Sequence, residues 1–396
     1  MTASHTPILA YDSADEYRPE PVPQPQAPAW RDGSIRIGIH TSIANGFAGS
    51  LQSAAKLGCN ALQIFSASPR MWPRVGARIP EIEAVEFRAK RAELGLGPVV
   101  IHANYLINLA SSDPVLRVRS IQAFHDEMVR GAALGADYLV VHPGSCCGKT
   151  PGTGKSSEQG IRDVAQAIRQ AARGMRLCGA FDDPCDCRLR LLLENTSGMG
   201  MAVGSRFEEL KAIIDAVPEL PLGICLDTAH AFHAGYGIHS EAGLAQMIAA
   251  LEGTLGLSRL GVLHVNDSKT PFGSRVDRHD HIGRGKIGLD GLGRVLNHPK
   301  LGASGAAGGR PGRAFLLETP IDAPGDDRRN VRRLWELVGV AAKQAPKGAG
   351  GTGSEDGFSM KKRGRAGAGA HGARPSQANR AKRAARSRRS ARASKG

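Results

Sequence analysis

Two patterns that decide the fold meet in residues 113–145, DPVLRVRSIQAFHDEMVRGAALGADYLVVHPGS. The first part repeats apolar residues at the spacing of an amphipathic helix, and Asp113 stands where a helix N-cap is expected. The second part contains YLVVHPG at 138–144, a short apolar run typical of a buried strand. Long amphipathic stretches that alternate with short apolar runs indicate repeated strand and helix units.

The same alternation extends in both directions from this unit. Another helical pattern covers 205–218, where Ser205 is the expected N-cap, and a last helix is expected at 326–344. The expected strands lie at 35–42, 61–68, 98–105, 138–144, 190–197, 222–229, 260–268 and 313–320. Eight strands, each followed by a helix over roughly 300 residues, predict an α/β fold of the (β/α)8 TIM-barrel type. An open doubly wound sheet is the alternative, but residues 38–50, GIHTSIANGFAGS, lack its Gly-rich fingerprint.

Composition divides the chain into three parts. Residues 1–33 are rich in Pro, Ala and acids, which is typical of a disordered leader, and 34–344 form the expected barrel. Residues 345–396 hold Gly, Ala, Ser and basic residues without an apolar period, so we expect a disordered basic tail. The tail accounts for most of the net charge of +15, because 361–396 contain thirteen Lys and Arg and no acid. Such a tail is suited to non-specific contacts with nucleic acid.

The composition argues against a membrane or secreted protein. No run of about 18 apolar residues occurs, and the first thirty residues lack the basic start and apolar core of a signal peptide. We therefore expect a cytoplasmic protein, and its odd number of seven cysteines favours reduced thiols. Three of them lie in CGAFDDPCDC, within 176–189. We interpret this stretch as a surface insertion rather than a zinc site, because a fourth ligand at recognisable spacing is missing.

Ionisable side chains stand at or near the ends of seven of the eight expected strands. A single histidine or carboxylate there is more often a hydrogen-bonded core or rim residue than a ligand. The strand ends of a parallel barrel converge on one rim, however, and so many imidazoles and carboxylates without a metal would leave charges unpaired. The residues concerned are His40, His102, His142, Glu194, Asp227, His230, His264, Asp267 and Glu318.

The types of these side chains restrict the metal and its chemistry. Imidazole and carboxylate ligands without thiolate suit zinc, manganese or iron, whereas magnesium and calcium prefer oxygen alone. The set exceeds what one four-coordinate ion requires, so we infer two or three ions. Clustered metals activate a water, neutralise phosphate and stabilise a leaving oxygen, which is the usual apparatus for hydrolysing phosphodiesters.

The segment VDRHDHIGRG at 276–285 follows the seventh expected strand and is expected above the same rim. Asp277 and His279 are two residues apart, so both point to one side of an extended segment and can bind one ion. Asp280 and His281 are then left to supporting or solvent-exposed roles. The cations of this loop, which either meet phosphate or are solvated charges, are Arg275, Arg278 and Arg284.

Five motifs stand in order along the chain: HANYLINLA (102–110), VVHPGS (140–145), LENTSGMG (193–200), LDTAHAFHAGY (226–236) and HVNDSKTPFGSRVDRHDHIGRGKIG (264–288). Together they resemble the endonuclease IV family, metal-dependent apurinic/apyrimidinic endonucleases with a TIM-barrel fold. The resemblance covers residues from about 35 to 340, and the segments SRVDRH and DTAHAF are highly specific.

The resemblance implies that three zinc ions (Zn²⁺) hydrolyse the DNA phosphodiester 5′ to an abasic site, leaving a 3′ hydroxyl and a 5′ deoxyribose phosphate. The ligands, carried over by motif, are His102, His142 and Glu194 for the first ion, Glu194, Asp227, His264 and Glu318 for the second, and His230, Asp277 and His279 for the third. Glu194, which bridges two ions, and Glu318 are the expected catalytic carboxylates.

The resemblance also implies double-stranded DNA with abasic sites as the partner of a monomeric enzyme, associated with the nucleoid through DNA. Arg70, Trp72 and Tyr105 match positions where the family inserts side chains into the helix to hold the abasic nucleotide outside the stack. Arg275 and Arg278 complete the expected DNA-binding set. The sequence departs from residues frequent in the family at three places, which leaves details of DNA contact open: Asn104, Cys146 and Arg284.

Two other functions are weighed against this one. A sugar isomerase on a related barrel also gathers histidines and carboxylates, but it typically keeps one or two metals and a proton-transfer base and has little use for SRVDRH. A silent barrel with a DNA-binding tail would leave the expected metal ligands unexplained.

Overall fold

The structure is a computed structural model that describes residues 35–147, 154–175, 177, 189–301 and 313–338. The expected leader at 1–33, nearly all of the insertion at 176–189 and the tail at 345–396 lie outside the described residues.

Eight parallel strands close into a barrel in the order β1-β10-β7-β6-β5-β4-β3-β2. Each lies within one of the expected apolar runs, so the (β/α)8 prediction is confirmed. The open sheet is excluded because β1 pairs with both β2 and β10, which leaves no edge. The strands are β1 (Arg36–His40), β2 (Ala61–Phe65), β3 (Val99–His102), β4 (Tyr138–Val141), β5 (Arg190–Glu194), β6 (Gly223–Asp227), β7 (Leu260–His264) and β10 (Ala314–Leu317).

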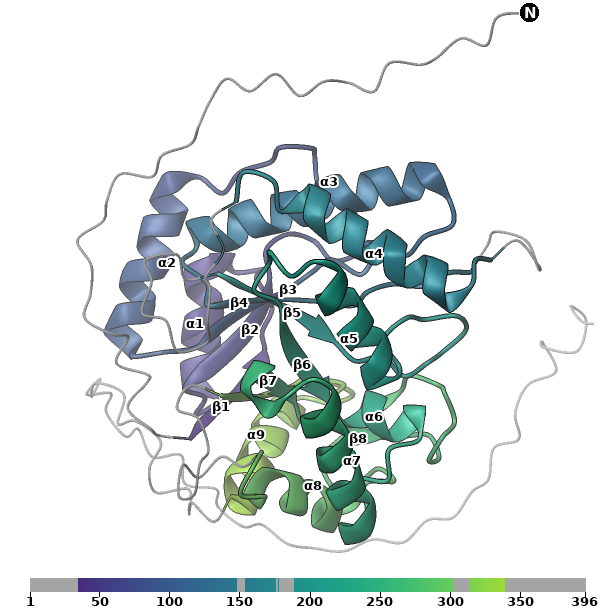
Figure 1. Cartoon of the computed structure of the whole chain (residues 1–396). Coiled ribbons are helices and arrows are strands. Elements are labelled where there is room, and N and C mark those ends of the chain that lie inside the picture. The colour runs from purple at the N-terminus through teal and green to yellow at the C-terminus, as the bar shows by residue number, and fades with distance from the viewer. Residues whose placement is uncertain (1–34, 148–153, 176, 178–188, 302–312, 339–396) are drawn as a thin grey trace, which may run out of the picture. The chain divides into compact units, whose positions relative to one another are not determined.

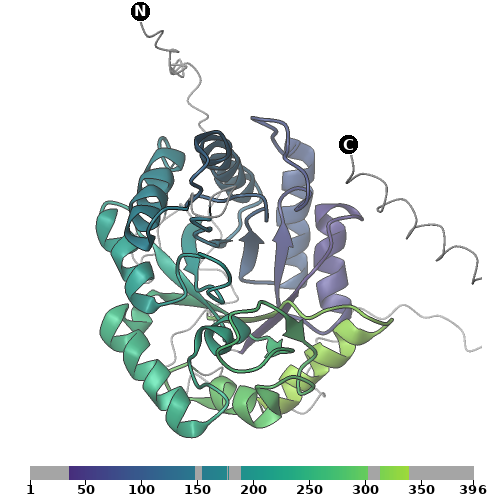
Figure 2. The same cartoon turned by 90° about the vertical axis from the view of Figure 1, so that its right-hand side faces the viewer.

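The helices surround these strands (Figures 1 and 2). Their apolar faces and the outer faces of the strands share one continuous core. The helices are α1 (Gly46–Lys56), α2 (Glu81–Leu94), α3 (Pro114–Ala133), α4 (Ser157–Ala171), α5 (Phe207–Ala216), α6 (Thr228–Ala234), α7 (Glu241–Thr254), α8 (Gly288–Asn297), α9 (Asp326–Leu337) and the 3-10 turn η2 (Leu257–Arg259). Among the described residues, no helix is both long and apolar enough to cross a membrane.

Of the two predicted helix N-caps, one is confirmed and the other is wrong by one residue. Asp113 caps α3 as expected, since its carboxylate accepts the N–H of Val115 at 2.9 Å. Ser205 is not the N-cap of α5, because the cap lies one residue later, at Arg206. The Glu209 carboxylate folds back to accept the backbone N–H groups of Gly204 at 2.9 Å and Arg206 at 3.4 Å, which satisfies the helix start without a serine cap. The last helix ends at Leu337, and the rest of its expected range from 339 on lies outside the described residues.

The barrel interior explains why the strand ends carry chemistry. A small apolar cluster, separate from the main core, fills the barrel and contains Ala61, Val100, Val140, Leu192, Cys225, Val262 and Leu316. Because alternate residues of a strand face the same side, the next inward residue lies two positions further on. At each of these strands that residue is polar, as is the corresponding residue of β1: His40, Gln63, His102, His142, Glu194, Asp227, His264 and Glu318. The apolar layer is therefore the floor of a polar site at the C-terminal rim.

Two small elements above the rim were not predicted. The strands β8 (Asp267–Ser268) and β9 (His279–Asp280) form an antiparallel ribbon in which Ser268 pairs with His279. The short helix α6 starts directly at the end of β6, with Asp227 as its N-cap. The ribbon folds the expected ligand loop back onto the barrel.

Candidate metal centre

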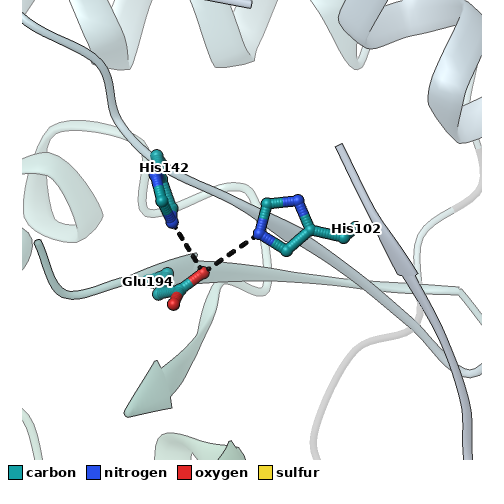
Figure 3. Close-up of side chains that lie close together, drawn as sticks. All are labelled: His102, His142 and Glu194. Atoms are coloured by element: carbon teal, nitrogen blue, oxygen red, sulfur yellow. Dashed lines mark ion pairs between the residues drawn. The ribbon is translucent and has the colours of Figure 1, made fainter. Parts of the chain in front are cut away.

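The first group of converging side chains comes from β3, β4 and β5. Glu194 Oε2 lies 3.4 Å from His102 Nε2 and 3.0 Å from His142 Nε2 (Figure 3). Potential ligand atoms of all three residues lie within 4.8 Å of one another, and His102 and Glu194 are buried. The three side chains that we expected at the first ion are thus brought together.

Two further groups overlap with the first. Glu194 Oε1 lies 2.9 Å from His264 Nδ1, which lies 3.3 Å from Glu318 Oε2 and 4.0 Å from Asp227 Oδ2. Asp227 also belongs to a third group, with His230 and His279. Asp277 joins that group, since its carboxylate oxygens lie 3.0 Å from His230 Nε2 and 3.4 Å from His279 Nε2. The structure therefore brings all nine expected ligands into one cluster, with Glu194 and Asp227 shared between groups.

Hydrogen bonds fix which ring nitrogen each histidine turns toward the cluster. The Nδ1 atoms of His102, His230 and His279 lie 2.8, 2.9 and 3.2 Å from the backbone carbonyl oxygens of Ala103, Asn195 and Glu318. A carbonyl only accepts, so each Nδ1 carries a proton and donates it, and each Nε2 faces the cluster, where a bound metal would take the place of a proton. This is the usual arrangement of metal-binding histidines.

His264 is oriented the other way round, by Gln63. The Gln63 Nε2 atom lies 2.5 Å from Glu318 Oε1, a carboxylate oxygen that only accepts, so it must be the amide NH₂. Gln63 Oε1 then accepts from His264 Nε2 at 2.8 Å. The proton of His264 is held on Nε2, and its Nδ1 faces the cluster.

The electrostatics of the cluster favour bound cations. Burial would raise the pKa of Glu194, but His264 and His142 hold that pKa well below its usual range. Burial would lower the pKa of His230, but Asp227 and Asp277 raise it well above its usual value. Without a metal, the buried carboxylates thus need protonated histidines as partners.

Two buried ligand atoms show that protons alone do not satisfy the site. Glu194 Oε2, whose partners are the ion-paired histidines His102 and His142, and His279 Nε2 are both buried and make no hydrogen bond within the described residues. Among the residues that the structure describes, Cys225 is the one thiol grouped with the cluster, beside Glu194 and His264. Burial raises the pKa of Cys225 to about 12, so it remains a thiol and a poor ligand. The donors that fit a metal are imidazole nitrogen and carboxylate oxygen, a set that suits zinc, manganese or iron.

Three residues of the loop and strand ends have roles that the sequence did not indicate. Asp267 is fully buried and is not a ligand, because its carboxylate accepts the N–H groups of Gly283, Gly285 and Ile287 at 2.9–3.0 Å. His281 is buried rather than solvent-exposed, with Nδ1 3.0 Å from Asn330 Nδ2. His40 lies against the cluster through Gln63, whose Nε2 is 3.0 Å from its Nδ1.

Two asparagines whose side-chain amides support the cluster, Asn195 and Asn266, were not identified from the sequence. Asn266 Nδ2 donates to Asp227 Oδ2 at 2.6 Å, and Asn266 Oδ1 accepts the N–H of Glu318 at 2.8 Å. Asn195 Oδ1 accepts the N–H of Asp227 at 2.7 Å. Their position in the sequence could have identified them, since each asparagine follows an expected strand-end ligand within two residues.

The expected DNA-binding residues lie in loops that follow strands at the same rim, and their side chains differ in solvent exposure. Arg70, Arg275 and Arg278 are exposed, and Tyr105 is 61% exposed with its ring 5.7 Å from that of His102. Trp72 is only half-exposed, because the Arg119 guanidinium lies 4.5 Å over its ring. Arg275 has a φ of 52°, and non-glycine residues held in this region cluster at functional sites.

Comparisons with known proteins show the family to which this barrel belongs. The family model for xylose isomerase-like TIM barrels matches residues 51–326. A probable endonuclease 4 from Solibacter usitatus is 45% identical over 309 residues, which cover 77% of this chain and 97% of that protein. The chain belongs to the endonuclease IV family. A second relative, the probable endonuclease 4 of Methanosphaerula palustris, is 37% identical over 77% of this chain and 98% of that protein.

Solved structures place the family within a wider fold. Endonuclease IV from Thermus thermophilus is 39% identical, with a TM-score of 0.63, and covers 77% of this chain and 100% of that chain. A D-psicose 3-epimerase superposes with a TM-score of 0.52 at 13% identity, over 77% of this chain and 100% of its own, and shares the fold alone. The protein is therefore an endonuclease of the endonuclease IV family, on a barrel that sugar epimerases also use.

Proposed function

We propose that the protein is a DNA-repair endonuclease that hydrolyses the phosphodiester 5′ to an abasic site with three zinc ions. The products would be a 3′ hydroxyl and a 5′ deoxyribose phosphate, and the enzyme would act as a monomer on double-stranded DNA. The observation that carries the proposal is the orientation of four histidines, His102, His230, His264 and His279, whose outer nitrogens are hydrogen-bonded so that the inner ones face shared carboxylates.

Three zinc ions held by the nine ligands would supply an activated water, neutralise phosphate and stabilise the leaving oxygen. The chain's own part is to hold the ligands rigidly. Glu194, fully buried, lies between the first two groups, and Glu318 is held by the Gln63 amide at the rim. These are the carboxylates that we propose at the reacting centre. The apolar floor below them keeps water out of the barrel interior.

The loops around the centre are suited to hold a distorted duplex. Arg70, Arg275 and Arg278 present exposed guanidinium groups for phosphate, and Tyr105 presents an exposed ring beside His102. Trp72 would support this surface from below, since it is stacked under Arg119. Insertion of side chains is easiest where a base is already missing, which favours abasic DNA.

The proposal is tested by elemental analysis of the purified protein together with incision of a duplex carrying one abasic analogue. We expect about three zinc ions per chain and a cut directly 5′ to the analogue. One manganese or magnesium ion per chain, with no incision by folded protein, would instead support a sugar isomerase.

Single substitutions test the third group of ligands. Asp277→Ala or His279→Ala should lose about one zinc equivalent and abolish incision, because each removes a ligand from one ion. His281→Ala is the matched control, and it should keep all the zinc and cut DNA. It should lower the free energy of unfolding by about 1–3 kcal/mol, because it removes a buried partner of Asn330. Loss of zinc from His281→Ala would show that the ligand set is wrong.

A further inference from the structure

A second concave site lies beside the metal centre, between the loop after β9 and helix α9. Its cavity volume is about 40 Å³. The loop contributes His281, Ile282 and Arg284 to its lining, and α9 contributes Asp326, Arg329, Asn330 and Arg333. The helical residues are three or four positions apart, so they share one face of α9. We call this site the Arg284 pocket.

The Arg284 pocket carries an excess of positive charge. Three guanidinium groups line it, against the single carboxylate of Asp326. Arg329 is paired with Asp326. Arg284 and Arg333 are exposed, and no other side chain among the described residues pairs with either. Two guanidinium groups without a carboxylate partner, in a pocket whose one carboxylate is already paired, suit an oxyanion, above all phosphate.

The loop that presents Arg284 is held on both sides. On the inside, Asp267 accepts the N–H groups of Gly283 and Gly285, and a Cβ on Gly285 would lie 2.4 Å from Asp267 Oδ1. On the outside, Asn330 Oδ1 accepts the N–H of Ile282 at 3.1 Å. The backbone of the loop that carries Arg284 is thus anchored to the same helix that carries Arg329 and Arg333, and such preorganisation favours binding.

The pocket also lies on the face where the substrate would bind. Its loop begins two residues after His279, a member of the metal cluster, and α9 follows β10 and Glu318 at the C-terminal rim. We propose that the Arg284 pocket binds a backbone phosphate of the DNA, outside the metal centre. This inference rests on the proposed function, and it assigns phosphate contact to Arg284, whose role the sequence left open, together with helix α9.

The experiment uses the full-length zinc-loaded protein and the double variant Arg284→Ala/Arg333→Ala. Affinity for a duplex with one abasic analogue is measured by fluorescence anisotropy at several salt concentrations. Loss of one phosphate contact should reduce the slope of log K against log salt by about 0.9, and weaken binding about fivefold at about 0.15 M salt. The control Arg173→Ala removes an exposed arginine that follows α4, at the opposite end of the barrel, and should leave the slope unchanged.

The outcomes separate the two proposals. If the wild-type protein fails to cut abasic DNA, the proposed function is wrong. If both variants cut DNA and bind it with the wild-type slope, only the Arg284 pocket is refuted. A third measurement adds inorganic phosphate at constant ionic strength and follows the Tm. Stabilisation by phosphate that the double variant loses, with an unchanged DNA slope, would mean that the pocket takes a free anion, and would overturn the assignment to DNA.

Discussion

Gln63 shows how one residue outside the proposed ligand set can orient two side chains that belong to it, His264 and Glu318. It is fully buried on β2, and its amide contacts His40, His264 and Glu318. We expect Gln63→Leu to weaken zinc binding about 10–100-fold, because His264 loses the acceptor that fixes its proton on Nε2. Zinc affinity is measured by competition with a chelator, and kcat for incision should fall while KM changes little.

The matched control for this change is Gln122→Leu on α3, where the amide donates to Asp126 Oδ1 at 3.3 Å. It makes the same side-chain replacement away from the cluster, so zinc affinity should stay at the wild-type level. Equal zinc affinity in Gln63→Leu and wild type would contradict the positioning role of Gln63.

A buried histidine gives the stability a pH dependence. Burial lowers the pKa of His233 from 6.5 to about 4, and its Nε2 donates to Ser268 Oγ at 2.6 Å. The unfolded chain takes up this proton near pH 6.5, but the folded protein resists it down to about 4. The contribution of His233 to the free energy of unfolding is therefore complete above pH 6.5 and is lost as the pH falls toward 4, at about 1.4 kcal/mol per pH unit.

The variant His233→Gln keeps a donor for Ser268 but does not titrate. Chemical denaturation of the metal-free wild type and variant across this pH range should give a flatter profile for the variant. Parallel profiles would show that other groups cause the acid sensitivity.

For single residues, the sequence predicted which side chains form the cluster better than it predicted the residues that support them. Histidines and carboxylates at strand ends stand out by type and position, and the resemblance assigned all nine. The roles of Gln63 and Asn266 could not be predicted, because amides are common and their function here depends on hydrogen bonds between strands far apart in the sequence. Asp267 stands near a strand end like the members of the cluster, but its carboxylate accepts the N–H of Gly283 in the loop and does not point to the cluster.

Among the elements, the loop at 283–288 depends on a single side chain. The buried Asp267 carboxylate accepts backbone N–H groups from Gly283, Gly285 and Ile287. Asp267→Asn replaces one acceptor oxygen by a donor that faces backbone donors, so the free energy of unfolding should fall by about 2–4 kcal/mol. Hydrogen exchange at those three amides should become faster. Asp290→Asn, at an exposed position in the first turn of α8, is the control that should change neither.

The elements themselves were predictable where burial dictates the pattern. Every barrel strand lies between a helical layer and the apolar interior, so its sequence is a short apolar run. The ribbon of β8 and β9 has two residues in each strand, too few to show an alternating period. The start of α5 was placed one residue early because a serine is a common cap, whereas Glu209 performs the capping from within the helix.

In the whole molecule, many of the basic residues lie in a segment apart from the proposed catalytic centre. We therefore expect non-specific DNA binding and catalysis to be separable. Thirteen of the basic residues lie at 361–396, outside the described structure and beyond every ligand. Deletion of 361–396 should weaken non-specific DNA affinity and flatten its dependence on salt, while kcat on saturating abasic substrate stays the same. Binding to undamaged duplex and steady-state incision measure the two effects. Unchanged affinity for undamaged DNA after the deletion would assign the tail to RNA binding or solubility instead.

Because the barrel is closed, its geometry does not depend on which strand comes first along the chain. Since β1 is hydrogen-bonded to β10 and α9 packs against β1, the first and last parts of the described barrel are neighbours. Helix α4 ends, and β5 begins, at the end of the barrel opposite the cluster. A circular permutant that joins the region after α9 to β1 and opens the chain between α4 and β5 would therefore keep the same ligands in a new order. The metal centre is a property of the closed ring of strands and does not depend on the order in which the chain visits them.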